Sequence, residues 1–156
     1  MDLSMLELSD QEIARRTSLN ELRSLGINPY PAAEYQVTAY AQEIINSYPE
    51  GNEEREALLR EQRVRLAGRI MGRRIMGKAS FVELADSTGR IQIYITRDSL
   101  ADGENTDLYN IVFKKCLDIG DFIGIEGYVF KTQTGEVSVH ALSLTVLSKS
   151  LRPLPI

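Results

Sequence analysis

The hydrophobic periodicity of the chain changes at Val64, and this change constrains the fold more than any other feature of the sequence. Before Val64, apolar residues recur near every third or fourth position, as on one face of a helix. From Val64 onward, Leu66 and Ile70 alternate with Arg65 and Arg69, which is typical of a half-buried strand. The sequence therefore predicts helices first and then a sheet whose first strand has one basic face.

Turn-forming residues divide the rest of the chain into further strands. Clusters of Ser, Thr, Asp and Gly separate stretches rich in Ile, Val, Phe and Tyr, which is the pattern of strands joined by short turns. A short helix is predicted over residues 106–115, after the third strand. The strands predicted after the one that begins at Val64 are residues 78–86, 90–96, 122–130 and 136–147.

Three strands, a short helix and two more strands form the order expected of an OB-fold. This fold is a Greek-key barrel of five strands, and its second and third strands commonly face the ligand. A β-sandwich is the alternative, but the small number of strands and the helix after the third favour the barrel. We therefore expect a mainly β protein: a five-stranded OB-fold Greek-key barrel with flanking N-terminal helices.

The segment before the barrel is predicted to form three helices. In the first, Ser9 is the expected N-cap, with Glu12 at capping-box spacing, and Gly26 ends the helix. The second is expected over residues 38–48 with Thr38 as its N-cap, and the third is expected over residues 52–62. The expected domains are a helical extension packed on the barrel over residues 1–62, the barrel over residues 63–148, and the start of a linker over residues 149–156.

Composition limits the functions that are open to the chain. Its 156 residues suffice for about one domain. One cysteine, Cys116, and one histidine, His140, exclude an internal disulfide and a Cys/His zinc site. The sequence lacks the roughly 20-residue apolar run that spans a bilayer, and its start does not resemble a signal peptide. We therefore expect a cytoplasmic protein that does not associate with membranes.

Charge is distributed unevenly along the chain. The net charge of -4 argues against a protein that binds nucleic acid by bulk attraction. Residues 63–98, however, carry 8 basic and 3 acidic side chains. Two interpretations stay open for this excess: a confined patch for an anionic partner, or a strand with a solvated arginine face.

The residues indicate no catalytic or cofactor site. His140 lies in the predicted fifth strand without a second histidine, so we expect an ordinary strand histidine. The acidic run Glu53–Glu56 fits a solvated helix face better than acid–base chemistry. The glycine clusters at Gly68–Gly72 and Met76–Lys78 lack the spacing of phosphate-binding loops and indicate bends in a barrel. We expect no catalytic residue, no metal and no cofactor in this chain.

Phe81 and Gln92 are candidates for reading a single-stranded base. The second and third predicted strands are joined by a short turn, and these two residues lie at similar distances from it. An aromatic ring offers a stacking surface, and a glutamine amide both donates and accepts hydrogen bonds, as the edge of uracil requires. The alternative is that Phe81 belongs to the core. Gln92 is flanked by Ile91 and Ile93, so alternation places it on the opposite face from them.

Several blocks of the sequence resemble the N-terminal domain of bacterial class II lysyl-tRNA synthetases, in the same order along the chain. The resemblance covers essentially the whole chain and is weakest over residues 32–62 and 99–110. The matching blocks are Glu21–Pro31, Gly68–Asp86 (GRIMGRRIMGKASFVELAD), Thr88–Asp98 (TGRIQIYITRD), Leu117–Gly127, Phe130–Ala141 (FKTQTGEVSVHA) and Leu147–Pro155.

The resemblance implies an anticodon-binding domain for lysine tRNA, whose anticodon is rich in uridine. In that family a phenylalanine stacks on the central uridine of the anticodon, and Phe81 occupies the matching position. A glutamine and an arginine hydrogen-bond the same base, and they match Gln92 and Arg74. A glutamate in the turn between the last two strands contacts the neighbouring anticodon base, and it matches Glu136.

Further expectations concern the RNA backbone and the parent enzyme. Charge alone suggests that Arg69, Arg73 and Lys78 contact phosphates. Enzymes of the family continue into a catalytic domain that uses ATP and Mg²⁺ to attach lysine to tRNA, and they are homodimers. Because this chain stops at Ile156, we expect it to bind the anticodon stem-loop of lysine tRNA without charging it.

Other functions stay open at this point. The corresponding domain of an aspartyl- or asparaginyl-tRNA synthetase shares the barrel and differs in anticodon preference. A single-strand-binding module without sequence preference would show a steep dependence on salt and indifference to sequence. A barrel that contacts only proteins would not bind tRNA at all.

Overall fold

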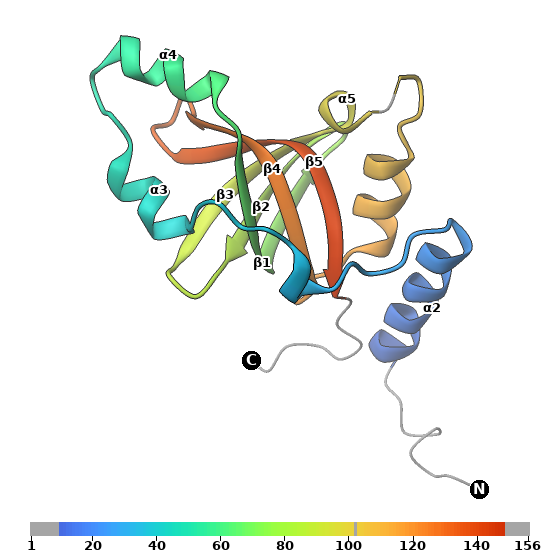
Figure 1. Ribbon diagram of the computed structural model, residues 1–156. Coiled ribbons are helices and arrows are strands. Elements are labelled where there is room, and N and C mark those ends of the chain that lie inside the picture. The colour runs from blue at the N-terminus through green and yellow to red at the C-terminus, as the bar shows by residue number, and fades with distance from the viewer. Residues whose placement is uncertain (1–9, 102, 149–156) are drawn as a thin grey trace, which may run out of the picture.

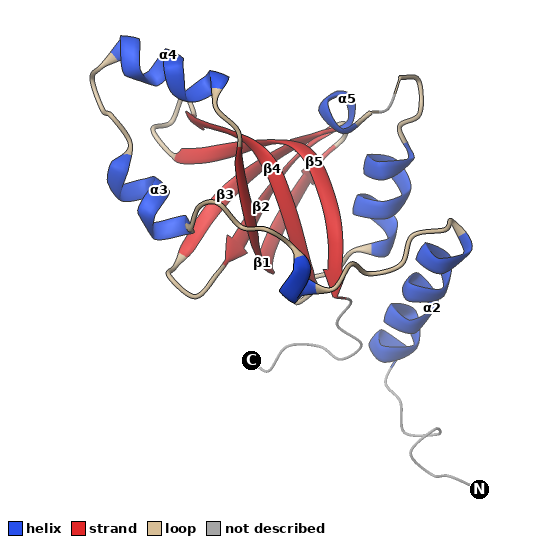
Figure 2. Ribbon diagram, in the orientation of Figure 1, coloured by secondary structure: helices blue, strands red, loops and turns tan. Residues whose placement is uncertain are grey.

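A computed structural model describes residues 10–101 and 103–148 of the chain (Figures 1 and 2). Its helices and strands follow the predicted order, with two short additions, η1 and α5. The expected N-cap Ser9 and the expected linker over residues 149–156 lie outside the described residues. The elements are α2 (Asp10–Ser24), η1 (Ala32–Glu34), α3 (Ala41–Ser47), α4 (Glu53–Glu61), β1 (Val64–Met76), β2 (Ala79–Ala85), β3 (Arg90–Thr96), α5 (Arg97–Leu100), η2 (Leu108–Cys116), β4 (Phe122–Lys131) and β5 (Val137–Ser148).

The strands close into a barrel in the order β1-β2-β3-β5-β4. All neighbouring pairs are antiparallel except β3 and β5, which run parallel. The predicted five-stranded Greek-key barrel with flanking N-terminal helices is confirmed. Figure 1 shows α3 and α4 beside one side of the barrel, and η2 and α2 beside the other. Among the described helices, none is long and apolar enough to cross a membrane.

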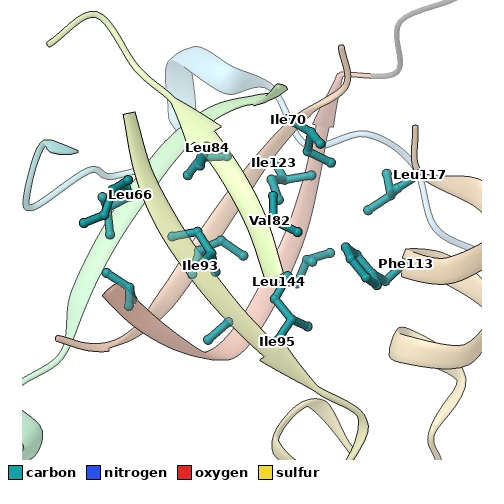
Figure 3. Close-up of a cluster of buried hydrophobic side chains, with 14 of the residues drawn as sticks. Leu66, Ile70, Val82, Leu84, Ile93, Ile95, Phe113, Leu117, Ile123 and Leu144 are labelled. Atoms are coloured by element: carbon teal, nitrogen blue, oxygen red, sulfur yellow. The ribbon is translucent and has the colours of Figure 1, made fainter. Parts of the chain in front are cut away.

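The core is the inside of this barrel. On β3, Ile91, Ile93 and Ile95 are at most 2% exposed, while the residues between them face outward. Phe113 and Leu117, from the end of η2 and the residue after it, lie at one end of the barrel beside these side chains (Figure 3). Each such side chain contributes about 1.5–3 kcal/mol when it leaves water. The alternation predicted from the sequence therefore fixes which residues face outward.

Strand β1 is about twice as long as its alternating segment predicts, and it contains a bulge where the alternation breaks. The pairing with β2 shifts register between Ile70 and Gly72. Before the bulge, Ile70 pairs with the buried Leu84. After it, Arg74 pairs with Phe81 and shares the outer face of the barrel. A bulge inserts one residue and so reverses the faces of the residues that follow. The bulge places Arg74 beside Phe81 instead of in the core.

The segment between α2 and α3 crosses the outside of the barrel. The amide of Tyr30 donates to the carbonyl of Val146, and the ring of Tyr35 packs against Gly124 of β4. A Cβ atom at position 124 would overlap that ring, so any larger residue there would force the Tyr35 ring to move. The guanidinium of Arg65 lies 4.6 Å from the centre of the same ring. These contacts attach the N-terminal segment to β1, β4 and β5.

Two sequence predictions about α3 are wrong. The helix begins at Ala41, not at residue 38, and Thr38 does not cap it. Instead, the Thr38 hydroxyl accepts a hydrogen bond from the amide of Arg65 at 2.8 Å, and so joins the segment to β1. The amide of Ala41 donates to the Asp86 carboxylate at 2.7 Å. The N-cap residue, Tyr40, makes no side-chain cap bond, and the first amide of α3 is instead satisfied by a residue 45 positions later, in the turn between β2 and β3.

Asp86 also organises its own turn. Its second carboxylate oxygen accepts hydrogen bonds from the amide and hydroxyl of Thr88 and from the amide of Gly89. Burial by itself raises the pKa of Asp86. The hydrogen bonds from Thr88, Ala41 and Gly89 outweigh burial, and the pKa lies below its ordinary value of 3.8. A carboxylate in this position holds α3 and the β2–β3 turn together.

The helical segment after β3 also differs in detail from the prediction. The sequence predicts a short helix over residues 106–115, and the structure has a π-helix, η2, over Leu108–Cys116. Helix α5 was not predicted. It begins directly after β3, where the Thr96 hydroxyl accepts from the amide of Ser99 at 3.1 Å. The predicted helix over residues 52–62 is confirmed as α4, with Asn52 as its N-cap.

Replacing Asp86 with alanine should lower the free energy of unfolding by about 1–2 kcal/mol at pH 7, the usual cost of a lost N-cap. Because the folded pKa lies below 3.8, this stabilisation is present above that value and disappears as pH falls through the folded pKa. Urea unfolding at pH 7 and in acid should therefore show the difference from wild type shrinking in acid. Asp107→Ala is the matched control, because Asp107 is exposed and its side chain caps no helix. A difference that does not change with pH would contradict this role.

Candidate nucleic-acid interface

Phe81 and Gln92 lie on the same outward face of the β2–β3 hairpin, as the alternation predicts. The core side chains Val82 and Ile93 face the other way. In the register of the two strands, Phe81 pairs with Tyr94, and Gln92 pairs with Glu83. The two candidates are therefore diagonal neighbours on this face, offset by two positions in the register, rather than directly opposite. Both are partly exposed, so the alternative that Phe81 belongs to the core is wrong.

A cavity of about 440 Å³ opens on this face. It brings together residues that are far apart in the sequence: Arg74 after the bulge of β1, Phe81 on β2, Gln92 on β3 and Glu136 in the turn between β4 and β5. All of the expected base-contacting residues line this one cavity. Its remaining lining residues are Gly72, Arg73, Val82, Glu83, Arg90 and Ile91.

The cavity has charged groups of both signs around an aromatic ring. The guanidinium of Arg74 lies 5.4 Å from the centre of the Phe81 ring. Arg90 and Glu83 form an ion pair at 2.9 Å on the rim. A flat ring, an amide and charged donors and acceptors are the groups that recognise an unpaired base.

Sequence reasoning missed Glu83 and Arg90 as lining residues. Each lies two positions from a predicted site residue on the same strand, Glu83 from Phe81 and Arg90 from Gln92. Because side chains two apart in a strand share a face, the period of two was sufficient to find them.

A second cavity of about 490 Å³ lies beyond Phe81 and shares Arg74, Phe81 and Gln92 with the first. Its wall is more aromatic, because Tyr94 and Phe130 line it. Both were missed from the sequence, although each alternates with buried neighbours on its strand. The turn between β4 and β5 completes this cavity with residues 132–134.

The three basic residues expected to contact RNA backbone lie in different surroundings. Lys78 is exposed in the turn between β1 and β2, next to Gly77, whose positive φ of 68° suits glycine. Arg69 lies on β1 before the bulge, with its guanidinium 4.7 Å from the centre of the Phe122 ring. Neither Lys78 nor Arg69 lines the two cavities that Phe81 shares.

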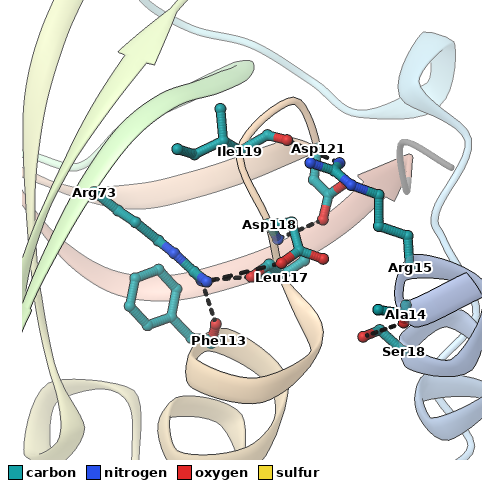
Figure 4. Close-up of polar contacts among 9 residues, drawn as sticks. All are labelled: Ala14, Arg15, Ser18, Arg73, Phe113, Leu117, Asp118, Ile119 and Asp121. Carbon is teal, nitrogen blue, oxygen red and sulfur yellow. Dashed lines mark hydrogen bonds and ion pairs between the residues drawn. The ribbon is translucent and has the colours of Figure 1, made fainter. Parts of the chain in front are cut away.

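Arg73 lines the first cavity, and its guanidinium also binds the end of η2 (Figure 4). It donates to the carbonyl of Phe113 at 3.2 Å and to the carbonyl of Leu117, and it lies 3.8 Å from the Asp118 carboxylate. Carbonyls at the end of a helix lack partners within the helix, and a cation is favourable there. Arg73 thus fastens the end of η2 to β1.

His140 has structural partners, in agreement with the expected strand histidine. Its Nδ1 atom is hydrogen-bonded to the Tyr128 hydroxyl at 2.7 Å, and its Nε2 atom to the Ser99 hydroxyl at 2.8 Å. Burial lowers the pKa of His140 below its ordinary value of 6.5. Within residues 10–101 and 103–148, no cluster of three or more His, Cys, Asp or Glu side chains is arranged to hold a metal ion.

Comparison with known proteins identifies the family of the barrel and relatives of the whole chain. Residues 64–147 match the model of the tRNA_anti-codon family, described as an OB-fold nucleic acid binding domain. The chain is 59% identical over 154 residues to a protein of Porphyromonas gingivalis named lysine–tRNA ligase. Proteins with the same name from Azobacteroides pseudotrichonymphae and Christiangramia forsetii are 64% identical over 149 residues and 50% identical over 152 residues.

These matches cover nearly all of the chain but a small part of each relative. They include 99%, 96% and 97% of the chain, and 26%, 28% and 25% of the respective relatives. The chain therefore spans about a quarter of the length of the proteins it resembles.

Replacing Arg73 with methionine should lower the free energy of unfolding by about 1–3 kcal/mol, because two buried carbonyls lose their charged partner. Urea unfolding measures this change. Arg74→Met, one position along, is the matched control: Arg74 is exposed, so its replacement should change stability by no more than about 0.5 kcal/mol. Wild-type stability together with lost RNA affinity in Arg73→Met would contradict this structural role and favour the expected contact of Arg73 with the RNA backbone.

Proposed function

The chain belongs to the tRNA_anti-codon family of OB-fold nucleic acid binding domains, and from this premise we propose that it reads the anticodon loop of lysine tRNA. The observation that carries the proposal is the convergence of Arg74, Phe81, Gln92 and Glu136 on one cavity from four separate parts of the chain. The relatives named lysine–tRNA ligase support lysine tRNA as the partner.

Each of these side chains has a distinct task in the proposed site. The exposed side of the Phe81 ring stacks on the central uridine of the anticodon. Gln92 has a donor and an acceptor on one amide, which match the carbonyl oxygen and the ring N–H on the edge of uracil. Arg74 packs near Phe81 and donates to a carbonyl oxygen of the same base.

The turn between β4 and β5 extends the site to a neighbouring base. Glu136 is exposed and lines the same cavity, so its carboxylate is placed to accept a hydrogen bond from a base N–H. Lys78 and Arg69 lie outside the cavity, and we assign them to the RNA backbone. Phosphate contacts position the RNA, and the contacts inside the cavity supply the selectivity.

We further propose that the chain is part of a lysine–tRNA ligase. In that protein, residues 63–148 are the barrel that reads RNA, residues 1–62 are a helical extension packed on it, and residues 149–156 begin a linker to a catalytic domain. ATP and Mg²⁺ would serve the aminoacylation reaction in that other domain. The parent protein would be a cytoplasmic homodimer. The barrel contributes binding energy and positioning to the reaction.

Replacing Phe81 with alanine should weaken binding of a lysine-tRNA anticodon stem-loop by about 1–3 kcal/mol, the range for one stacked base. Fluorescence anisotropy at one fixed salt concentration measures the change. Leu58→Ala is the control, because Leu58 is 52% exposed on α4 and lines neither of the two cavities around Phe81. Wild-type affinity in Phe81→Ala would rule out stacking on this ring.

Replacing Gln92 with alanine should mainly reduce selectivity for uridine at the central anticodon position. A base that leaves a polar group unpaired is disfavoured, and this penalty disappears together with the amide. The measurement is the affinity of Gln92→Ala for stem-loops with each of the four bases at that position. Equal weakening for all four bases would exclude Gln92 from base recognition.

A further inference from the structure

The Phe81 ring is the first in a row of rings across the outer face of the barrel. The centre of Phe81 lies 5.1 Å from that of Tyr94, with an angle of 37° between the rings. The ring centres of Tyr94 and His140 are 5.1 Å apart, with an angle of 79° between the rings, and those of His140 and Tyr128 are 5.0 Å apart. Each step joins two residues that pair across neighbouring strands. The row therefore follows the barrel register over β2, β3, β5 and β4.

His140 is the fixed member of this row. One ring nitrogen is hydrogen-bonded to the hydroxyl of Tyr128 on β4, and the other is hydrogen-bonded to the hydroxyl of Ser99 in α5. Rotation of the imidazole would break a hydrogen bond at each end. The edge-on contact with His140 then restricts the orientation of the Tyr94 ring. The centre of the Tyr94 ring also lies 6.1 Å from that of Phe130. Tyr94 is thus held between β5 and β4 on one side and Phe81 on the other.

Phe81 has fewer restraints of its own. It carries no hydrogen-bonding group, and the two cavities that it lines leave space around its ring. On a strand, two side-chain rotamers about χ1 are commonly populated. Among the described residues, Tyr94 is the aromatic side chain in contact with Phe81. The other close group, the guanidinium of Arg74, is at the end of a flexible, exposed side chain.

We propose that Tyr94 is a positioning residue: backed by His140, it holds the Phe81 ring in the one orientation in which a base can stack on it. The inference rests on the proposed function, because it assigns a task to Tyr94 through Phe81. Tyr94 then improves RNA binding without touching the stacked base. Pre-ordering a ring before binding reduces the entropy lost when the complex forms.

The free protein provides the first test, with no RNA present. Three-bond NMR couplings of Phe81 report the population of its χ1 rotamers. Wild type and Tyr94→Phe should show one dominant rotamer, because both keep the backing ring. Tyr94→Leu should show couplings averaged over more than one χ1 rotamer of Phe81. Tyr40→Leu is the matched control, since Tyr40 is 46% exposed before α3. A single unchanged rotamer in Tyr94→Leu would overturn the proposal.

A double-mutant cycle provides the second test. Tyr94→Leu should weaken binding of the lysine anticodon stem-loop by about 2- to 12-fold, the equivalent of one aromatic pair. In a Phe81→Ala background the same change should cost less than about 2-fold, because Tyr94 acts through Phe81. Equal losses in both backgrounds would mean that Tyr94 contacts the RNA itself, and they would overturn the proposal.

The two tests separate this inference from the proposed function. If wild type does not bind the stem-loop, or if Phe81→Ala binds it as wild type does, the proposed function fails. The NMR couplings still decide whether Tyr94 orders Phe81. If wild type binds and Phe81→Ala loses affinity while Tyr94→Leu does not, the positioning role alone fails. Thermal unfolding of Tyr94→Leu and Tyr94→Phe confirms that each variant is folded at the temperature of measurement.

Discussion

The register of the β2–β3 hairpin is the constraint on which the rest of the structure depends. Val82 and Leu84 on β2, and Ile91, Ile93 and Ile95 on β3, are almost completely buried. A slip of one residue would expose all of them and bury the outward set. Each buried side chain contributes about 1.5–3 kcal/mol, and one stacked base contributes about 1–3 kcal/mol. The core therefore determines the register, and the RNA-binding face follows from it.

Contacts distant in sequence keep this hairpin in place before any ligand arrives. The Asp86 carboxylate joins the turn of the hairpin to the start of α3, and Tyr35 packs on Gly124 on the other side of the barrel. Arg73 fastens η2, whose Phe113 lies at one end of the core. The same elements that stabilise the barrel thus hold Phe81 and Gln92 in position. A preformed site loses less entropy on binding than one that must be ordered.

The periodic parts of this structure were predictable from the sequence, and the long-range contacts were not. Alternation placed Gln92 opposite its isoleucine neighbours, and the strand order gave the barrel. The failures have one physical origin. Thr38 resembles a helix cap, yet its hydroxyl binds Arg65, and the first amide of α3 is satisfied by Asp86, 45 residues away from Ala41. Likewise, the bulge after Ile70 moves Arg74 to the outer face. The secondary-structure propensity of a local segment does not show which residue of a distant strand or turn will contact it.

The most direct test of anticodon reading compares two RNAs on the unmodified chain. A lysine anticodon stem-loop and the same stem-loop with cytidine at the central position are titrated at one fixed salt concentration. The cavity around Phe81, Gln92 and Arg74 predicts a preference for uridine of about 5-fold or more, the equivalent of about 1 kcal/mol for a lost polar contact. Equal affinity for the two RNAs would contradict base-specific reading by this face.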